Sequence, residues 1–174
     1  GRSARDGILI KGGEFLETAA KIDVVAVDKT GTLTRGRPQL TDVVALAPGV
    51  DEQQVLAWAA RAEAGSEHPL ARPILEAAEK AGIAASELPE HIEPVAGKGI
   101  TARVDGKQVL IGNLALLQQF GVADSVGADE QALELARQGR TPMIVAVDEE
   151  VLGVIAVADE IRHDAAAMVA ALHK

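Results

Sequence analysis

An aspartate stands directly after a short apolar run near the start of the chain. The residues V-V-A-V at 24–27 lead into D-K-T-G-T at 28–32. Open α/β sheets place their chemistry just beyond the carboxyl ends of strands, where a carboxylate serves as a nucleophile, a metal ligand or a turn former. A carboxylate that attacks a phosphoryl group forms an acyl phosphate, and Mg²⁺ offsets the charge of the approaching groups. Thr30 offers phosphate oxygens a hydroxyl, and Gly31 lets the loop approach closely.

The longer stretch D-K-T-G-T-L-T at 28–34 resembles the phosphorylation motif of P-type ATPases, within the haloacid-dehalogenase-like superfamily. The resemblance implies that ATP phosphorylates Asp28, with Lys29 in the catalytic group. It also implies that Thr30 helps to hold the phosphate, and that Asp28 and Thr30 bind Mg²⁺. Phosphatases of the superfamily carry a second aspartate two residues after the nucleophile. The threonine at this position activates water poorly, so the expected acyl phosphate persists.

A second motif, S-E-H-P-L-A at 66–71, resembles the Ser-x-His-Pro signature of the heavy-metal-transporting branch of these pumps, the copper or zinc/cadmium branch. The resemblance places His68 near the adenine of ATP, and Ser66 and Pro69 belong to the same motif. Glu63 falls where that branch has a glutamate of the nucleotide pocket. From the residues alone, His68 is a helix N-terminal residue without a special task, and Glu63 is a solvated helix charge.

Two glycine-containing stretches follow in the order expected of that branch: G-K-G-I at 97–100 and I-G-N at 111–113. Missing side chains let a flat purine lie against the backbone. The first stretch alone suits a turn, and the second suits a strand end followed by a helix cap. The resemblance adds four residues to the predicted nucleotide-binding set: Gly97, Gly99, Gly112 and Asn113.

Two further stretches resemble parts of these pumps at the ends of the chain. D-E-I-R at 159–162 resembles the element with which the chain returns to the phosphorylation domain, and we expect it to follow a strand and open a helix. Asp159 then either contacts nucleotide or caps that helix. G-I-L-I-K-G-G at 7–13 resembles the segment that follows a transmembrane helix.

Composition excludes several classes of function. The formal net charge of −9 argues against a general nucleic-acid-binding surface. The absence of cysteine excludes disulfides and thiolate metal ligands within the chain. No apolar run approaches the roughly 20 residues of a membrane span. The chain as given is therefore expected to be soluble and monomeric. The resemblance to P-type ATPases implies that it is a piece of an integral membrane protein, at the cytoplasmic face of the membrane.

Hydrophobic periodicity and turn residues predict alternating helices and strands. A buried strand is expected at 22–27, a linker around 36–38 and a further strand at 40–46. The Asp-Gly pair at 105–106 predicts a hairpin. The other expected helices are 12–20, 51–62, 69–80, 113–120, 128–138 and one from 162, and the other expected strands are 91–96, 99–104, 108–112, 143–147 and 151–157.

The resemblance turns these elements into a domain prediction. Residues 1–36 form a membrane-proximal segment and the first arm of a phosphorylation domain. Residues 37–155 form an ATP-binding domain, and 156–174 begin a truncated second arm. The expected fold is α/β: an antiparallel sheet flanked by helices, inserted in a partial haloacid-dehalogenase-like, Rossmannoid phosphorylation domain.

The predicted function is that of the ATP-binding cytosolic part of a pump that couples ATP hydrolysis, through an aspartyl phosphate at Asp28, to metal export. The expected cofactors are ATP and Mg²⁺. The expected partners are the membrane and actuator domains and the rest of the phosphorylation domain, and no nucleic acid. This piece alone is expected to bind ATP without turnover. The alternatives are a soluble phosphatase of the same superfamily and a non-catalytic nucleotide-binding module.

Overall fold

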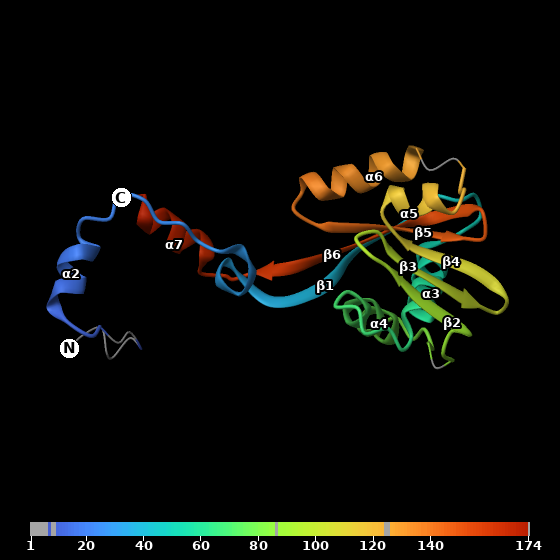
Figure 1. Ribbon diagram of the computed structural model, residues 1–174, viewed down its shortest axis with the longest axis horizontal. Helices are drawn as coiled ribbons and strands as arrows, with labels where there is room; N and C mark the ends of the chain where they lie inside the picture. Colours follow the sequence, from blue (N-terminus) through green and yellow to red (C-terminus); the bar gives the residue numbers. More distant parts are fainter. Residues whose placement is uncertain (1–6, 8–9, 86, 124–125, 174) are drawn as a thin grey trace. The chain divides into compact units, whose positions relative to one another are not determined.

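The computed structural model describes residues 7, 10–85, 87–123 and 126–173, so part of the stretch at 7–13 lies outside the described residues (Figure 1). The chain divides into two compact units. The split unit comprises Gly1–Thr34 and Ile161–Lys174, and the sheet unit comprises Arg35–Glu160.

A six-stranded sheet, in the order β1-β6-β5-β4-β3-β2, forms the centre of the sheet unit. The four neighbouring pairs from β2 to β6 are antiparallel. This confirms the predicted antiparallel sheet flanked by helices. The strands are β1 (Thr34–Ala45), β2 (His91–Val95), β3 (Gly99–Val104), β4 (Lys107–Gly112), β5 (Thr141–Val147) and β6 (Glu150–Ile161).

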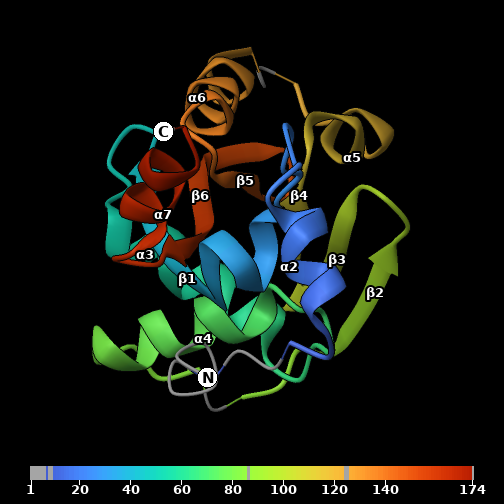
Figure 2. The ribbon, with the colours of Figure 1, turned by 90° about the vertical axis from the view of Figure 1, so that its left-hand side faces the viewer.

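Helices cover both faces of this sheet, as Figures 1 and 2 show. The pair α3 (Glu52–Glu63) and α4 (Ala71–Lys80) packs on one face, and α5 (Leu114–Gln119) and α6 (Val126–Arg137) pack on the other. The strands serve both layers because successive side chains alternate between faces. In β4, Val109 and Ile111 pack with the α3 layer, and Leu110 packs with the α5 layer.

Local sequence signals place two of these elements as predicted. Asp105 and Gly106 have φ values of 52° and 74°, which are the left-handed conformations that a two-residue hairpin requires. At the start of α3, Asp51 Oδ1 accepts a hydrogen bond of 2.8 Å from the Gln54 N–H, and Gln54 Oε1 accepts one of 2.9 Å from the Asp51 N–H. This reciprocal capping box fixes the start of the helix that carries Glu63.

The buried strand predicted at 22–27 is wrong. These residues have no strand structure, and none of their apolar side chains is buried: Val24 is 84% exposed and Val27 is half-buried. A strand is stable only beside a partner that satisfies its N–H and C=O groups. None of the described strands pairs with this segment. The apolar run therefore lacks the neighbouring strand that it would need to form a buried strand.

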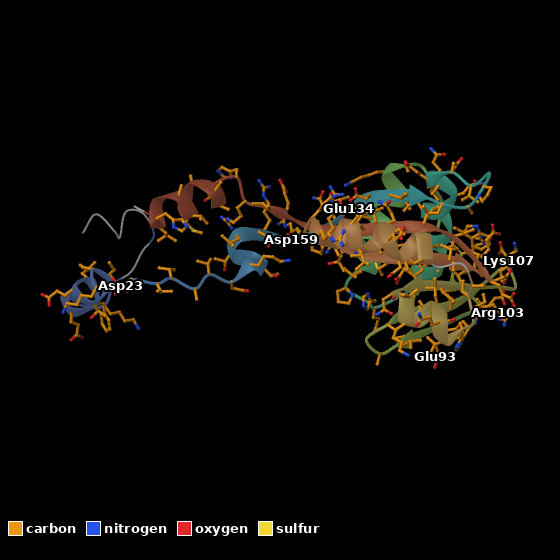
Figure 3. All side chains as sticks on the ribbon, turned by 90° about the horizontal axis from the view of Figure 1, so that it is seen from above. Asp23, Glu93, Arg103, Lys107, Glu134 and Asp159 are labelled. Carbon is orange, nitrogen blue, oxygen red and sulfur yellow. The ribbon has the colours of Figure 1, made fainter. Side chains whose placement is uncertain are left out.

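The linker predicted around 36–38 is also wrong, because these residues belong to β1. Pro38 fits there since β1 is an edge strand, where a missing N–H costs no ladder hydrogen bond. The chain is held at this point by Asp159 of β6, which is labelled in Figure 3. Its Oδ2 accepts from the Gly36 N–H at 2.9 Å, and its Oδ1 accepts from the Arg37 N–H at 2.8 Å.

Asp159 therefore neither opens nor caps a helix, which corrects that prediction. Strand β6 continues to Ile161, and the last helix, α7 (Ala165–Leu172), starts later, with Asp164 at its N-cap position. The split unit also contains α2 (Gly13–Ala19) and the turn η1 (Lys29–Leu33). Its two chain pieces are joined by a hydrogen bond of 2.9 Å from the Arg162 N–H to the Leu33 carbonyl oxygen.

Candidate functional site

The D-K-T-G-T loop is an exposed turn that the side chain of Thr34 closes. The Oγ1 of Thr34 donates to the Lys29 carbonyl oxygen at 3.1 Å and accepts from the Gly31 N–H at 3.2 Å. Gly31 has φ 78°, in the region that favours glycine. Thr34 is buried, whereas the side chains of Asp28 and Thr30 are exposed. The sequence assigned no task to Thr34, which shapes the loop from inside.

The donor set of this loop fits Mg²⁺ in part. Asp28 and Thr30 offer one carboxylate and one hydroxyl, and Mg²⁺ commonly takes one or two carboxylates with water and substrate phosphates. Within the described residues, no group of three or more His, Cys, Asp or Glu side chains forms a metal site. Asp28 therefore suits one coordination position, and the described residues do not complete the shell.

A buried carboxyl group ends helix α3. Glu63 is 1% exposed, and its Oε2 has no hydrogen-bond partner among the residues that the structure describes. Burial raises the pKa of this carboxyl group, while a hydrogen bond from Ser66 and the nearby charge of His68 act to lower the pKa. The interpretation of Glu63 as a solvated helix charge is therefore wrong. Its unpartnered oxygen is the kind of group that a ligand with a hydrogen-bond donor satisfies.

The segment after α3 folds back on Glu63 through a chain of hydrogen bonds. The Ser66 N–H donates to the Glu63 carbonyl oxygen at 2.9 Å, and the His68 N–H donates to Ser66 Oγ at 3.2 Å. The Leu70 N–H then donates to His68 Nδ1 at 3.3 Å. The structure thus brings together Glu63, Ser66 and His68. Because this turn occupies Pro69 and Leu70, helix α4 starts at Ala71 rather than at Pro69.

Two adjoining cavities flank this segment. The first, of about 430 Å³, is the His68 groove, lined by Ser66, Glu67, His68, Pro69, Arg72, Leu75, Glu76 and Glu79. The second, of about 570 Å³, is the Arg37 cavity, lined by Gly36, Arg37, Pro38, Gln39, Pro69, Arg72, Pro73 and Glu76. Pro69, Arg72 and Glu76 line both cavities, and the predicted site residues Ser66, His68 and Pro69 line the first.

Three predicted glycines lie at one end of strands β3 and β4, and the structure requires glycine at them for different reasons. Gly99 lies opposite Gly112, and a Cβ on Gly99 would collide with the Ile111 carbonyl oxygen. A Cβ on Gly112 would collide with the Lys98 carbonyl oxygen. These two glycines are therefore needed by the protein's own backbone. Gly97 has φ 70° and open space where a Cβ would point.

Asn113 joins this end of the sheet to helix α5. Its Oδ1 accepts from the Leu116 N–H at 3.1 Å, and its Nδ2 donates to the Gly97 carbonyl oxygen at 3.0 Å. The strand end and helix cap expected at I-G-N are therefore present. The same side chain holds the turn that carries Gly97, so a nucleotide at that turn would lie on a fixed backbone.

The predicted nucleotide-binding residues form two groups, one around Glu63 and one around Gly97, and no hydrogen bond joins the groups among the described residues. The direction of Glu63 follows from helix geometry. Arg61 forms an ion pair of 2.6 Å with Asp105 at the opposite, hairpin end of β3. Residues two apart on a helix point about 200° apart. Glu63 therefore lies on the opposite side of α3 from Arg61.

Comparison with known proteins assigns the family. A family model described as haloacid dehalogenase-like hydrolase matches residues 22–174, and the chain belongs to this family. Within it, the chain is 42% identical over 168 residues to a manganese-exporting P-type ATPase of Mycobacterium bovis, covering 95% of this chain and 23% of that protein. The resemblance to heavy-metal P-type ATPases is thereby confirmed.

Solved structures agree. A zinc-transporting PIB-type ATPase in the E2·Pi state superposes with a TM-score of 0.78 at 38% identity, over 98% of this chain and 27% of that chain. The N-domain of a copper-transporting P-type ATPase superposes with a TM-score of 0.57 at 27% identity, over 69% of this chain and 99% of that domain. The chain spans about a fifth to a quarter of the curated relatives that it matches. None of the helices in the described residues has the length and apolar character to cross a membrane.

Replacing the buried acid changes how stability depends on pH. Burial raises the pKa of Glu63 in the folded state above the ordinary value of 4.5. Its stabilising contribution is therefore complete below the unfolded-state pKa and is lost as pH rises through the folded-state pKa. We expect Glu63→Gln to become more stable relative to the wild type as pH rises, measured by urea unfolding from about pH 4 to pH 8. Glu67→Gln, at an exposed neighbour, is the control, and a wild-type-minus-Glu63→Gln difference that is constant with pH contradicts the assignment.

Proposed function

We propose that this chain is the ATP-binding cytosolic part of a heavy-metal cation-transporting P-type ATPase, with Asp28 as the residue that is phosphorylated. A carboxylate oxygen of Asp28 forms a bond to the γ-phosphorus of ATP, and the bond from that phosphorus to the bridging oxygen breaks. ADP leaves with the electron pair, and an aspartyl phosphate remains. Bound Mg²⁺ would spread the charge of the phosphate oxygens.

One observation carries this proposal: Asp28 is an exposed carboxylate at the head of a turn that Thr34 holds, in a chain related along 95% of its length to a P-type ATPase. The side chain of Lys29 is exposed beside it. Thr30 stands where phosphatases of the family have their second aspartate, which disfavours the alternative of a soluble phosphatase. A long-lived acyl phosphate suits a machine that must change conformation before dephosphorylation.

The nucleotide is proposed to bind to the sheet unit, with its adenine among Glu63, His68, Gly97 and Gly99. Three features of the sheet unit support this. The Oε2 of Glu63 lacks a donor among the residues that the structure describes, His68 is exposed beside a groove, and Gly97 leaves open space at a turn that Asn113 holds. Ser66 and Pro69 would shape the first group, and Gly112 and Asn113 the second. The likeness to an N-domain of a copper-transporting pump adds to this support.

The proposed transported ion is a heavy-metal cation, and no particular metal is assigned. The relatives above carry manganese, zinc and copper in their names. Ion ligands of such pumps lie in the membrane, and the proposed partners are the membrane domain, the actuator domain and the rest of the phosphorylation domain. A non-catalytic nucleotide-binding module remains the second candidate for this piece alone, favoured by the incomplete Mg²⁺ shell around Asp28.

Removing the imidazole of His68 tests the nucleotide site. We expect His68→Ala to weaken ATP binding by about five- to tenfold, because a base stacked on an aromatic ring is worth about 1–3 kcal/mol. The measurement is an NMR titration of the ¹⁵N-labelled chain with ATP. The matched control is His91→Ala, which removes an exposed imidazole beside Glu93 on β2 (Figure 3). If ATP moves no signals of Glu63, His68 or Gly97, or if both variants bind like the wild type, the site is elsewhere.

Replacing the nucleophile tests the phosphorylation step. In the full-length protein, we expect Asp28→Asn to abolish the acid-stable phosphoenzyme formed from γ-labelled ATP, because an amide oxygen does not form an acyl phosphate. Asp23→Asn, at an exposed aspartate in the same segment (Figure 3), is expected to keep the label. A labelled band of wild-type intensity in Asp28→Asn would remove this residue from its role.

A further inference from the structure

Two arginines from distant parts of the sequence line the Arg37 cavity. Arg37 lies on β1, and Arg72 lies in the first turn of α4. The cavity adjoins the His68 groove, and Arg72 borders both. Both cavities belong to the sheet unit, and Pro69, Arg72 and Glu76 are common to their linings.

Charge changes sign between the two cavities. The His68 groove is lined by Arg72 and by three carboxylates, from Glu67, Glu76 and Glu79. The Arg37 cavity is lined by two guanidinium groups and one carboxylate. The chain as a whole carries a net charge of −9, whereas the ionisable side chains that line the Arg37 cavity are two arginines and one glutamate. An anionic end of a ligand is favoured on the side of β1, and a neutral base with amino donors is favoured on the acidic side.

The two guanidinium groups differ in their present partners. The Nε of Arg72 donates to Glu76 Oε1 at 2.7 Å, and this hydrogen bond lowers the pKa of Glu76. The guanidinium of Arg37 has no hydrogen-bond or ion-pair partner among the described residues. Its backbone is nevertheless fixed, because its N–H donates to Asp159. Arg37 thus presents an unpaired cation from a held position.

We propose that Arg37 and Arg72 form a subsite for the polyphosphate of the nucleotide whose adenine binds beside His68; this inference rests on the proposed function. Planar guanidinium groups match phosphate oxygens with two parallel N–H donors. Arg37 lies near the start of the sheet unit, which begins at Arg35, and follows Asp28 by nine residues in the sequence. Arg72 exchanges part of its contact with Glu76 for phosphate.

The test compares nucleotides that differ in phosphate content, on the whole 174-residue chain. Affinities for ATP and for adenosine are measured by isothermal titration calorimetry. We expect Arg37→Gln and Arg72→Gln each to weaken ATP binding about three- to tenfold, while adenosine binding changes less than about twofold. Arg72→Lys keeps the charge and is expected to lose less than Arg72→Gln.

Matched controls exist for both positions. Arg35→Gln removes an exposed arginine that pairs with Glu160 at 3.4 Å and does not line the cavity. Arg137→Gln removes an α6 arginine that pairs with Glu134, as Arg72 pairs with Glu76 on α4. Both controls are expected to bind ATP like the wild type, and NMR spectra of all variants check that the fold is retained.

Three outcomes would overturn the subsite. ATP binding of wild-type strength in Arg37→Gln and Arg72→Gln would leave the proposed function intact and remove the subsite alone. Equal weakening of ATP and adenosine would show that the arginines act on the adenine site or on the fold. A wild-type chain that binds neither ATP nor adenosine would remove the subsite together with the proposed nucleotide site.

Discussion

The carboxyl group of Glu63 is the most demanding feature of the sheet unit. A buried acid with an oxygen that lacks a partner costs free energy, because neither ionisation nor neutrality satisfies all of its lone pairs. The capping box at Asp51 fixes the start of α3, and its end then places Glu63 under the turn of Ser66 and His68. Buried ionisable groups with a shifted pKa are common at binding and catalytic sites. A hydrogen-bond donor on a bound ligand would satisfy the free oxygen of Glu63.

The two units differ in how completely they bury their apolar side chains and pair their backbone groups. The sheet unit has two hydrophobic layers, one on each face of the sheet. Its strands from β2 to β6 form antiparallel pairs, with one register shift between β5 and β6 at Val145 and Ala146. In the split unit, the apolar segment at 22–27 is mostly exposed and pairs with none of the described strands. The catalytic aspartate proposed here follows that segment. Its turn is shaped from within by the two hydrogen bonds of Thr34 Oγ1, and Leu33 at its end accepts a hydrogen bond from the Arg162 N–H.

Features that depend on near neighbours in sequence could be predicted well. The hairpin at 105–106, the capping box at Asp51 and the alternation along β4 each follow from local rules. The errors concern long-range partners: 22–27 lacks a neighbouring strand, 36–38 gains one in β6, and Asp159 binds backbone 122 and 123 residues away. No local pattern signals such partners.

The candidate site shows the same division. The motifs at 28–34, 66–71, 97–100 and 111–113 could be found in the sequence, because each is a short string of residues. The burial of Glu63 and the backbone contact between Gly99 and Gly112 could not, since each arises from packing between elements. The meeting of Arg37 with Arg72 is likewise a product of the fold.

The most direct test is the titration of the Glu63 side chain itself, followed by its ¹³C carboxyl signal with and without ATP. Without nucleotide, we expect a pKa above the ordinary value, because burial disfavours the charged form. ATP should lower that pKa, because an amino donor of the adenine stabilises the carboxylate. An ordinary pKa in the free chain that ATP leaves unchanged would contradict the account.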